Sequence, residues 1–381
     1  MKKENIVILF GGAHLAYSPT IMQLYDELNK FANVTIYAEY VKDFIAQKVI
    51  DKNVFYYEAQ EWVKPPFIKK VKYFFLRRFS GQAKTLEKAG LKLKEVYPDY
   101  LRIKYFLKEG KYDRIIANDT INLFYCATMG IHTDFLSLEL SIGEKLMPFV
   151  NKNTIDCVIT QSKERFKYLL GNFSVNTFII PNAPNYTESK ISTSKKGLLF
   201  GGSAWDPFGI YHCADYLKIY KETALTVQGA YPNGELKKLQ LKYSDLIEEK
   251  LFILNETFLK NDDVVEYFST FEIGICFYNF EYKWIQHFNY ESAPSGKIFK
   301  YLAAGVPVLA IDILGFKFIQ EMECGVLIKD LKPQSIRNGI EEIRRNYTFF
   351  ASNTIIAAKH YSFDKAVTPY INYIKESADK K

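Results

Sequence analysis

The sequence predicts an α/β protein built from two doubly wound, Rossmann-like domains. Its 381 residues are more than one hydrophobic core usually serves, so two domains are expected. Short apolar runs typical of parallel strands alternate with helical patterns, and the same alternation starts again near Gly197. Two such domains would face each other across a cleft and bind ligands at the carboxyl ends of their strands.

The first domain opens with a strand, a glycine loop, a helix and a second strand. We expect the regular elements at Asn5–Phe10, Pro19–Leu28 and Asn33–Ala38. Gly11 and Gly12 follow the first strand without the full glycine spacing of a dinucleotide site, but they suit a backbone that approaches a ligand closely. Further strands are expected at Arg114–Ala117, Phe135–Leu140, Cys157–Thr160 and Thr177–Ile180.

The second domain repeats this pattern after a polar hinge. Pro, Asn, Thr and Ser accumulate at Pro181–Lys190, as is typical of a linker. We therefore expect one domain at 1–184 and a second at 185–361. The strands of the second are expected at Gly197–Phe200, Ala224–Gln228, Leu251–Ile253, Ile273–Phe277 and Val306–Ile311.

Composition limits the setting of the protein. Aromatic residues make up 16% of the chain, which favours either aromatic packing or contact with sugar rings or lipid. The five cysteines have no metal-ligand spacing and are expected as free thiols in a reducing compartment. The N-terminal apolar run is too short for a signal peptide, and no stretch approaches the roughly 20 apolar residues of a membrane-spanning helix. A cytoplasmic location is the resulting expectation.

Much of the net charge of +7 comes from one basic and aromatic segment, 64–111. Its lysines and arginines alternate with Phe and Tyr, a pattern that suits peripheral contact with an anionic membrane surface. The alternative is a solvated helix whose aromatic side chains point into the core. No nucleic-acid-binding motif accompanies the charge, so nucleic acid is not expected as a partner.

The most informative stretch is SAPSGKIFKYLAAGVPVLA, Ser292–Ala310. Ser295 can cap a helix whose first turn holds Lys297, and Gly305 is placed to end that helix before a buried strand at Val308–Ile311. Free N–H groups at the helix start, with a lysine beside them, could bind an anion such as a diphosphate. An ordinary loop, helix and strand of an α/β protein would show the same residues.

This stretch resembles the donor-binding signature of GT-B glycosyltransferases of the family 4 type (glycosyl transferases group 1). The matching residues are Ser295, Lys297, Ala303, Ala304, Gly305, Pro307 and Val308. Two further segments, FIIPNAPN at 178–185 and GLLFGGSAWD at 197–206, resemble the linker entry and the glycine loop of the second domain. The resemblance spans nearly the whole chain and implies the GT-B fold, with a C-terminal helix, here 362–381, that crosses back to the first domain. It also implies a nucleotide-sugar as donor substrate.

One position departs from the family pattern. Many of these enzymes carry two glutamates separated by seven residues, of which the second grips the ribose hydroxyls of the donor. Here Ser292 and Lys300 take those positions, with Glu291 as a candidate substitute. A cation cannot accept hydrogen bonds from ribose, so the donor is held differently, or its charge differs, or the site has decayed. The donor-binding candidates are Gly12, Gly202, Ser203, Glu291, Ser295, Gly296, Lys297 and Lys300.

Three residues of the first domain are candidates for catalysis. Glycosyl transfer needs a stabilised leaving diphosphate, and either a base or a face that holds donor and acceptor in line. His14 follows the glycine pair, and Asp119 follows a strand end. Glu139 lies in the apolar segment SLEL, where burial would require a partner or a raised pKa. Each of these side chains could instead be structural.

We expect neither a metal site nor a cofactor. The chain contains no Asp-x-Asp ligand pair, and the adjacent Asp262 and Asp263 are better explained as capping residues in a turn before a helix. Helix N-termini and cations, Lys297 first among them, would then meet the phosphate charge.

The sequence therefore favours a metal-independent, retaining glycosyltransferase. It would move a sugar from a nucleotide-sugar donor to a glycan or lipid-linked acceptor at the inner face of a membrane, in polysaccharide biosynthesis. Two alternatives remain. One is a nucleotide-sugar epimerase of the same architecture, and the other is a degenerate GT-B scaffold protein in which Lys300 records lost catalysis.

Overall fold

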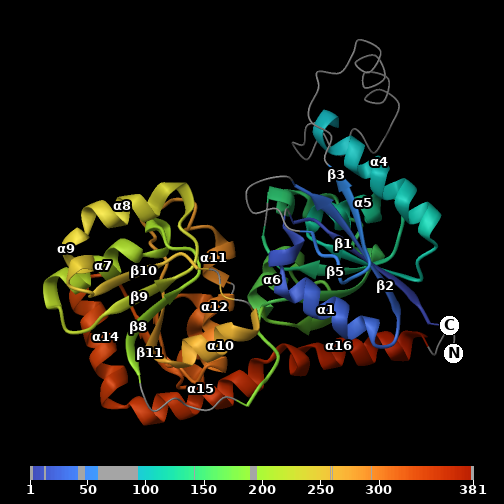
Figure 1. Cartoon of the computed structure of the whole chain (residues 1–381). Coiled ribbons are helices and arrows are strands. Elements are labelled where there is room, and N and C mark those ends of the chain that lie inside the picture. The colour runs from blue at the N-terminus through green and yellow to red at the C-terminus, as the bar shows by residue number, and fades with distance from the viewer. Residues whose placement is uncertain are drawn as a thin grey trace. The chain divides into compact units, whose positions relative to one another are not determined.

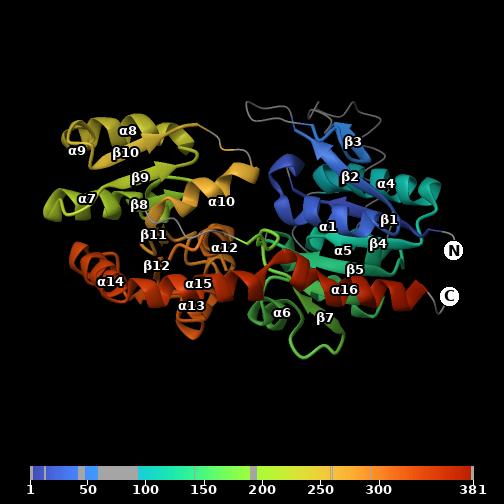
Figure 2. The same cartoon turned by 60° about the horizontal axis from the view of Figure 1, so that its bottom comes forward.

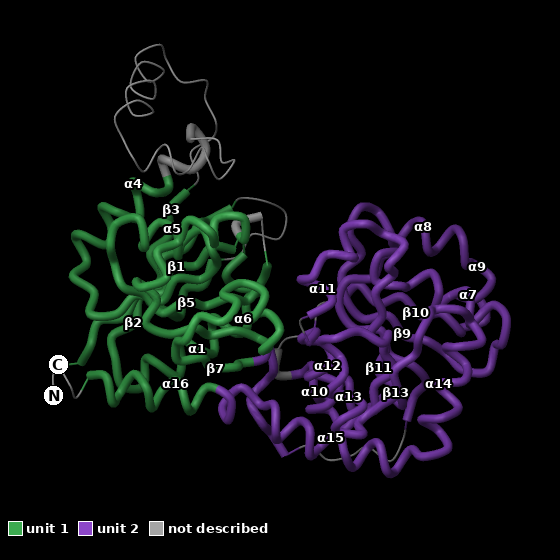
Figure 3. Tube along the Cα trace, turned by 180° about the vertical axis from the view of Figure 1, so that it is seen from behind, with its two compact units in different colours: residues 1–180, 367–381 green, residues 181–366 purple. Residues whose placement is uncertain are grey.

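The computed structural model describes residues 3–12, 14–41, 48–58, 93–140, 142–188, 195–257, 259, 261–292 and 294–378. The chain divides into two compact units, Met1–Ile180 with Val367–Lys381 and Pro181–Ala366 (Figure 1, Figure 3). Each unit is a parallel sheet flanked by helices, as expected of an α/β protein (Figure 2). We call them unit 1 and unit 2.

In its described residues, unit 1 contains a seven-stranded parallel sheet of order β3-β2-β1-β4-β5-β6-β7. The strands are β1 (Asn5–Phe10), β2 (Asn33–Tyr40), β3 (Val54–Glu58), β4 (Arg114–Asn118), β5 (Thr133–Ser137), β6 (Ile155–Thr160) and β7 (Asn176–Ile179). The helices are α1 (Pro19–Asn29), α4 (Leu93–Gly110), α5 (Thr120–Thr128), α6 (Lys163–Leu170) and most of α16 (Phe363–Ala378), with the 3₁₀ helices η1 (Leu15–Tyr17), η2 (Ile142–Phe149) and η3 (Lys152–Thr154). The central strand β1 is a continuous apolar run because helices cover both of its faces.

The described part of unit 2 contains a six-stranded parallel sheet of order β10-β9-β8-β11-β12-β13. The strands are β8 (Lys196–Gly201), β9 (Leu225–Gln228), β10 (Phe252–Asn255), β11 (Phe271–Cys276), β12 (Val308–Ile311) and β13 (Gly325–Ile328). The helices are α7 (Ile210–Tyr220), α8 (Glu235–Lys242), α9 (Ser244–Glu248), α10 (Asn261–Ser269), α11 (Phe288–Ser292), α12 (Gly296–Ala303), α13 (Lys317–Glu321), α14 (Pro333–Arg345) and α15 (Tyr347–Tyr361), with η4 (Asp206–Phe208), η5 (Pro232–Gly234) and η6 (Leu314–Phe316).

Strand order reverses at one point in each sheet. In unit 1 the chain crosses from β3, on the β2 side of β1, to β4 on the other side, and in unit 2 it crosses from β10, on the β9 side of β8, to β11. Parallel α/β sheets bind ligands outside the carboxyl ends of the strands at such points. The loops after β1 and β4, and those after β8 and β11, are therefore the places to look for a site.

Four elements differ from the sequence expectations. The edge strand β3 and the last strand β13 were not expected, and β5 ends at Ser137 instead of continuing to Leu140. The chain turns away there because Leu138 and Glu139 lie in a bend. Helix α10 begins at Asn261, so Asp262 and Asp263 lie in its first turn and not before it.

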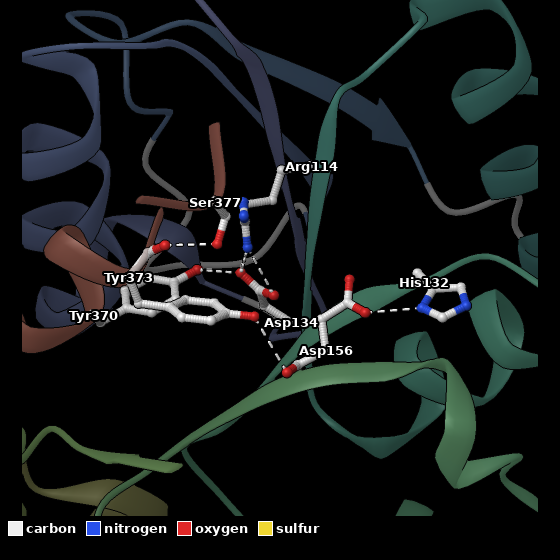
Figure 4. A network of polar contacts seen from close by, with 7 residues as sticks. All are labelled: Arg114, His132, Asp134, Asp156, Tyr370, Tyr373 and Ser377. Atoms are coloured by element: carbon white, nitrogen blue, oxygen red, sulfur yellow. Dashed lines mark hydrogen bonds and ion pairs between the residues drawn. The ribbon is translucent and has the colours of Figure 1, made fainter. Parts of the chain in front are cut away.

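A buried polar network holds α16 against the sheet of unit 1 (Figure 4). The Tyr370 hydroxyl donates a 2.7 Å hydrogen bond to Oδ2 of Asp134, and Arg114 pairs with the same carboxylate at 2.8 Å. Tyr373 adds a 3.3 Å bond to the backbone carbonyl of Asp156. Asp134 is completely buried, which raises its pKa, and the Arg114 charge acts in the opposite direction. Polar bonds as well as packing therefore join this helix to unit 1.

Most of the basic segment 64–111 lies outside the described residues, which resume at Leu93. On α4 the side chains of Lys104, Tyr105 and Lys108 are exposed. None of the described helices combines the length and the apolar character needed to cross a bilayer.

Candidate functional site

The donor-binding candidates of unit 2 gather at the carboxyl ends of β8 and β11, two strands that pair in parallel. The chain leaves β8 through Gly202, whose φ of +96° is a conformation that glycine adopts without strain. Gly202 and Ser203 are exposed. The amide of Gly201 donates a 2.7 Å hydrogen bond to the hydroxyl of Tyr301, a buried residue of α12. This bond joins the glycine loop to α12.

Helix α12 begins at Gly296, with Ser295 at its N-cap position. The Ser295 side chain makes no capping hydrogen bond and interacts with the Cys276 thiol instead, so the expected capping role is wrong. At the other end Gly305 has a φ of +69°, and its amide bonds the Leu302 carbonyl at 3.0 Å, which ends the helix where the sequence predicted. The first-turn N–H groups of α12 thus donate no hydrogen bond to the N-cap side chain.

The Lys297 side chain extends from the first turn of α12 into the interior of unit 2. Its Nζ is buried and has no hydrogen-bond partner among the described residues. The atom lies 4.7 Å from the ring centroid of Phe200 and 5.4 Å from that of Phe208. Its charge also acts on the buried thiols of Cys213 and Cys276. Lys297 is therefore a partly buried residue whose ammonium is itself buried, beside two aromatic rings and close enough to two thiols to act on them.

Ser292 and Lys300, the two positions that depart from the family pattern, lie within five residues of Lys297 in the sequence, as does the neighbouring Glu291 within six. Burial lowers the pKa of Lys300, because desolvation disfavours the charged ammonium. Glu291 is exposed in the short helix α11. Ser292 is buried and donates a 2.6 Å hydrogen bond to the carbonyl of Phe288, so its hydroxyl has a structural partner.

In unit 1, Asp119 follows β4 directly and caps α5. Its Oδ1 accepts hydrogen bonds from the amides of Ile121 and Asn122 at 2.9 and 3.1 Å. The backbone has φ +70° and ψ +167°, a region that is almost restricted to glycine and costs about 1–3 kcal/mol. Burial raises the pKa of Asp119 to about 6, although the two amide bonds act against this. A strained carboxyl group that titrates near neutrality suits proton transfer or substrate contact.

The loop after β1 packs directly against Asp119. A Cβ atom on Gly11 would lie 1.7 Å from Oδ2 of Asp119, so only glycine fits there. At Gly12 a Cβ atom would lie 2.4 Å from the Phe10 ring. His14 is partly buried at the N-cap of η1. Because β1 and β4 are paired neighbours, this loop and Asp119 share one edge of the sheet.

Glu139 is exposed, although its apolar neighbours in the sequence suggested that it would be buried. It lies two residues beyond the end of β5, and its side chain is 72% exposed. Its Oε2 is 4.0 Å from the guanidinium of Arg165, which is buried and donates to the carbonyl of Leu138 and, at 3.0 Å, to Oε1 of Gln161. Glu139 therefore lies beside a buried cation, in the segment after β5, the strand that neighbours β4.

Sequence reasoning gave no binding role to the aromatic residues of the loop after β8 or to their neighbour Trp284. Trp205 and Phe208 follow the glycine loop, with ring centroids 5.8 Å apart, and Trp284 lies 5.3 Å from Trp205. The available signal was the position of Trp205 and Phe208 directly after the glycines. Among the residues that the structure describes, no three His, Cys, Asp or Glu side chains are grouped so that they could hold a metal ion.

Two Rossmann-like units with these parallel sheets define the GT-B glycosyltransferase fold, and solved structures of that class match nearly the whole chain. Sucrose-phosphate synthase (tll1590) from Thermosynechococcus elongatus matches with a TM-score of 0.66 and 13% identity, over 99% of this chain and 100% of that one. An E. coli trehalose-6-phosphate structure bound with UDP-2-fluoro glucose matches with a TM-score of 0.58 and 11% identity, over 99% and 98%. The lipopolysaccharide outer core galactosyltransferase WaaB, in its apo form, matches with a TM-score of 0.55 and 14% identity, over 96% and 99%.

At these identities the likeness establishes the fold. No protein-family model matches the sequence, and no curated protein matches it by sequence.

Proposed function

We propose that the protein is a glycosyltransferase that binds the diphosphate of a nucleotide-sugar donor at Lys297. The observation that carries this proposal is the buried Nζ without a hydrogen-bond partner among the described residues. It lies on a helix start and beside a glycine loop, at the strand ends where parallel α/β sheets bind ligands.

The energetics of Lys297 support an anionic ligand. An ammonium group taken out of water loses several kcal/mol of hydration unless it is paired. Contacts with aromatic faces return about 2 kcal/mol when desolvated, so the rings of Phe200 and Phe208 offset only part of this loss. The three N–H donors of the ammonium are best satisfied by charged oxygens, and phosphate supplies them at short range.

This arrangement suits the chemistry of glycosyl transfer. Negative charge grows on the leaving diphosphate as the bond to the sugar breaks, and fixed cations and helix N–H groups stabilise that charge. Lys297 and the first turn of α12 would take this role, with contributions from Gly202, Ser203 and Gly296 along the backbone. We propose transfer without a metal ion on this basis, with Lys300 as an additional cation for the donor.

The acceptor side of the reaction is proposed for unit 1. Asp119, with its pKa near 6, is the residue best suited to move a proton or to bind an acceptor hydroxyl. His14 shares its sheet edge, and Glu139 would contact acceptor groups farther out. Retention of the anomeric configuration is proposed from the family resemblance.

A surface glycan precursor is the proposed acceptor. WaaB is by its title a galactosyltransferase of the lipopolysaccharide outer core, and the trehalose-6-phosphate structure holds a UDP-sugar. These similarities suggest a nucleotide-sugar donor and a glycan acceptor for this chain.

A lipid-linked acceptor would place the protein at a membrane surface. The exposed Lys104, Tyr105 and Lys108 of α4 suit an anionic leaflet, with Tyr105 60% exposed. Co-sedimentation with phosphatidylglycerol vesicles, but not with phosphatidylcholine vesicles, is expected, and Lys104→Glu with Lys108→Glu should weaken it. If wild type and variant sediment equally, α4 does not take part in membrane contact.

The donor is tested first by thermal shift against UDP, GDP, CMP, dTDP and their common sugars, with and without divalent metal. A ligand at 100 times its dissociation constant stabilises the folded state by about 2.7 kcal/mol. We expect a metal-independent shift with one nucleotide, and its loss in Lys297→Met. The matched control is Lys242→Met, which removes an exposed lysine that also lies over two rings, those of Tyr211 and Tyr243.

The outcomes separate the candidate functions. No shift with any nucleotide would favour the non-catalytic scaffold. Conversion of the nucleotide-sugar to its epimer without an acceptor would favour the epimerase. A nucleotide that stabilises wild type and Lys297→Met equally would place the donor elsewhere.

A further inference from the structure

Two loops of unit 2 carry an aromatic cluster that borders Lys297. Trp205 and Phe208 belong to the loop after β8, and Trp284 and Tyr290 to the chain between β11 and α12. The ring centroids of Trp284 and Tyr290 are 5.2 Å apart, and those of Trp205 and Trp284 are 5.3 Å apart. Because Phe208 contacts both Trp205 and Lys297, the Trp205 indole and the buried ammonium are parts of one site. Trp284 packs against Trp205, is 39% exposed and is not counted in that site.

The indole N–H of Trp205 is a second unpartnered donor in this site. Nε1 is buried and has no hydrogen-bond partner in the described part of the chain, although buried indole N–H groups normally have one. The residue is held from both sides. The Ala204 amide bonds the Ala230 carbonyl at 2.8 Å, and the Asp206 carboxylate accepts a 2.6 Å bond from the Tyr282 hydroxyl. The first bond fixes the backbone before Trp205, and the second holds the side chain of the residue after it.

The two unpartnered groups share one chemical property. An ammonium and an indole N–H can donate but cannot accept, so a ligand that satisfies both must present several acceptor oxygens. Both groups lie against Phe208, and a diphosphate carries its oxygens over a comparably short length. We infer that the Trp205 N–H donates a hydrogen bond to an oxygen of the donor's diphosphate. This inference rests on the proposed function and adds a neutral, directional contact to the charge of Lys297.

The test compares two chemically identical substitutions. Trp205→Phe and Trp284→Phe each remove an indole N–H and keep an aromatic ring, but only that of Trp205 is buried without a partner. Dissociation constants are measured for UDP, GDP, dTDP and inorganic pyrophosphate by calorimetry and by tryptophan fluorescence. A Trp62→Phe background restricts the fluorescence to Trp205 and Trp284, the other two tryptophans of the chain.

We expect Trp205→Phe to weaken the nucleoside diphosphate and pyrophosphate by about tenfold or more, as for loss of a hydrogen bond to a charged oxygen. Trp284→Phe should change the affinity for pyrophosphate less than twofold. Unfolding temperatures of both variants confirm that they fold.

Each other outcome overturns a stated part. If Trp205→Phe binds these probes with wild-type affinity, the inferred hydrogen bond from Trp205 is wrong, while the Lys297 site stands. If Trp205→Phe loses affinity for nucleoside diphosphates but not for pyrophosphate, Trp205 contacts a part of the nucleotide other than the phosphates. Failure of wild type to bind any of these probes would overturn the proposed function together with this inference.

Discussion

The hydroxyl of Tyr370 donates a 2.7 Å hydrogen bond to the buried carboxylate of Asp134, which lies 236 positions earlier in the chain. Asp134 also pairs with Arg114, so removing the phenol leaves the buried carboxylate with its charged partner but with one hydrogen-bond donor fewer. Tyr370→Phe should lower the free energy of unfolding by about 1–3 kcal/mol.

Urea denaturation measures this effect. Tyr373→Phe is the matched control, because its hydroxyl makes a longer, 3.3 Å bond to a backbone carbonyl that is not buried. If Tyr373→Phe loses as much unfolding free energy as Tyr370→Phe, the stabilisation does not come from the hydrogen bond to the buried carboxylate.

Asp119 should make stability depend on pH. Its pKa of about 6 in the folded state exceeds the usual value of 3.8, so the folded protein binds this proton more tightly than the unfolded chain. The stabilisation is fully present below about pH 4 and is lost as the pH rises to about 6, amounting to at most about 3 kcal/mol. Asp119→Asn keeps a capping oxygen and the same backbone strain, so the comparison isolates the effect of the carboxyl proton.

Wild type should therefore gain stability relative to Asp119→Asn as the pH falls from 7 to 4.5. Urea midpoints of both proteins across this range provide the measurement. A constant difference between them would mean that Asp119 titrates as it does in the unfolded chain.

Lys300 should cost stability at neutral pH. Burial lowers its pKa in the folded state, so the unfolded chain holds the proton more tightly and stability rises as the pH increases toward 10.5. Lys300→Met should raise the denaturant midpoint at pH 7, and the gain should shrink at higher pH. The exposed Lys218→Met is the control. An unchanged midpoint in Lys300→Met would indicate that the ammonium is well solvated.

The five cysteines should be unreactive in the folded protein. All five are buried free thiols, and burial raises the pKa of Cys126 and Cys324 to about 12, so little thiolate forms at pH 8. Ellman's reagent should detect no thiol within minutes under native conditions and five in guanidinium. Immediate reaction of one thiol with the native protein would locate a segment that opens readily.

The elements predicted best from the sequence are continuous apolar runs that are bounded by glycines or turns. The expected bounds of β1 match the structure residue for residue, and so does the shorter run given for β12, Val308–Ile311. The edge strand β3 is half exposed and rich in tyrosine, and β13 is only four residues long, so neither has a clear period. Glu139 was misjudged because its apolar neighbours suggested a strand that in fact ends at Ser137.

The site was predictable only as far as local pattern reaches. The position of Lys297 in the first turn of α12 follows from the glycine and serine before it. Its burial does not, because the rings that cover it come from β8 and from the loop that follows. Trp205 was given no binding role for the same reason. An unpartnered N–H is a property of three-dimensional packing, and no spacing in the sequence records it.

The division of unit 1 between two stretches of the chain sets an order of assembly. Unit 2 is continuous from Pro181 to Ala366, whereas unit 1 requires Val367 onward to cover Asp134. During synthesis on the ribosome, unit 1 would therefore start first but be completed last, because its sheet is covered only after α16 has been made. An isolated version of unit 1 would need residues 1–180 joined to 367–378 by a short linker.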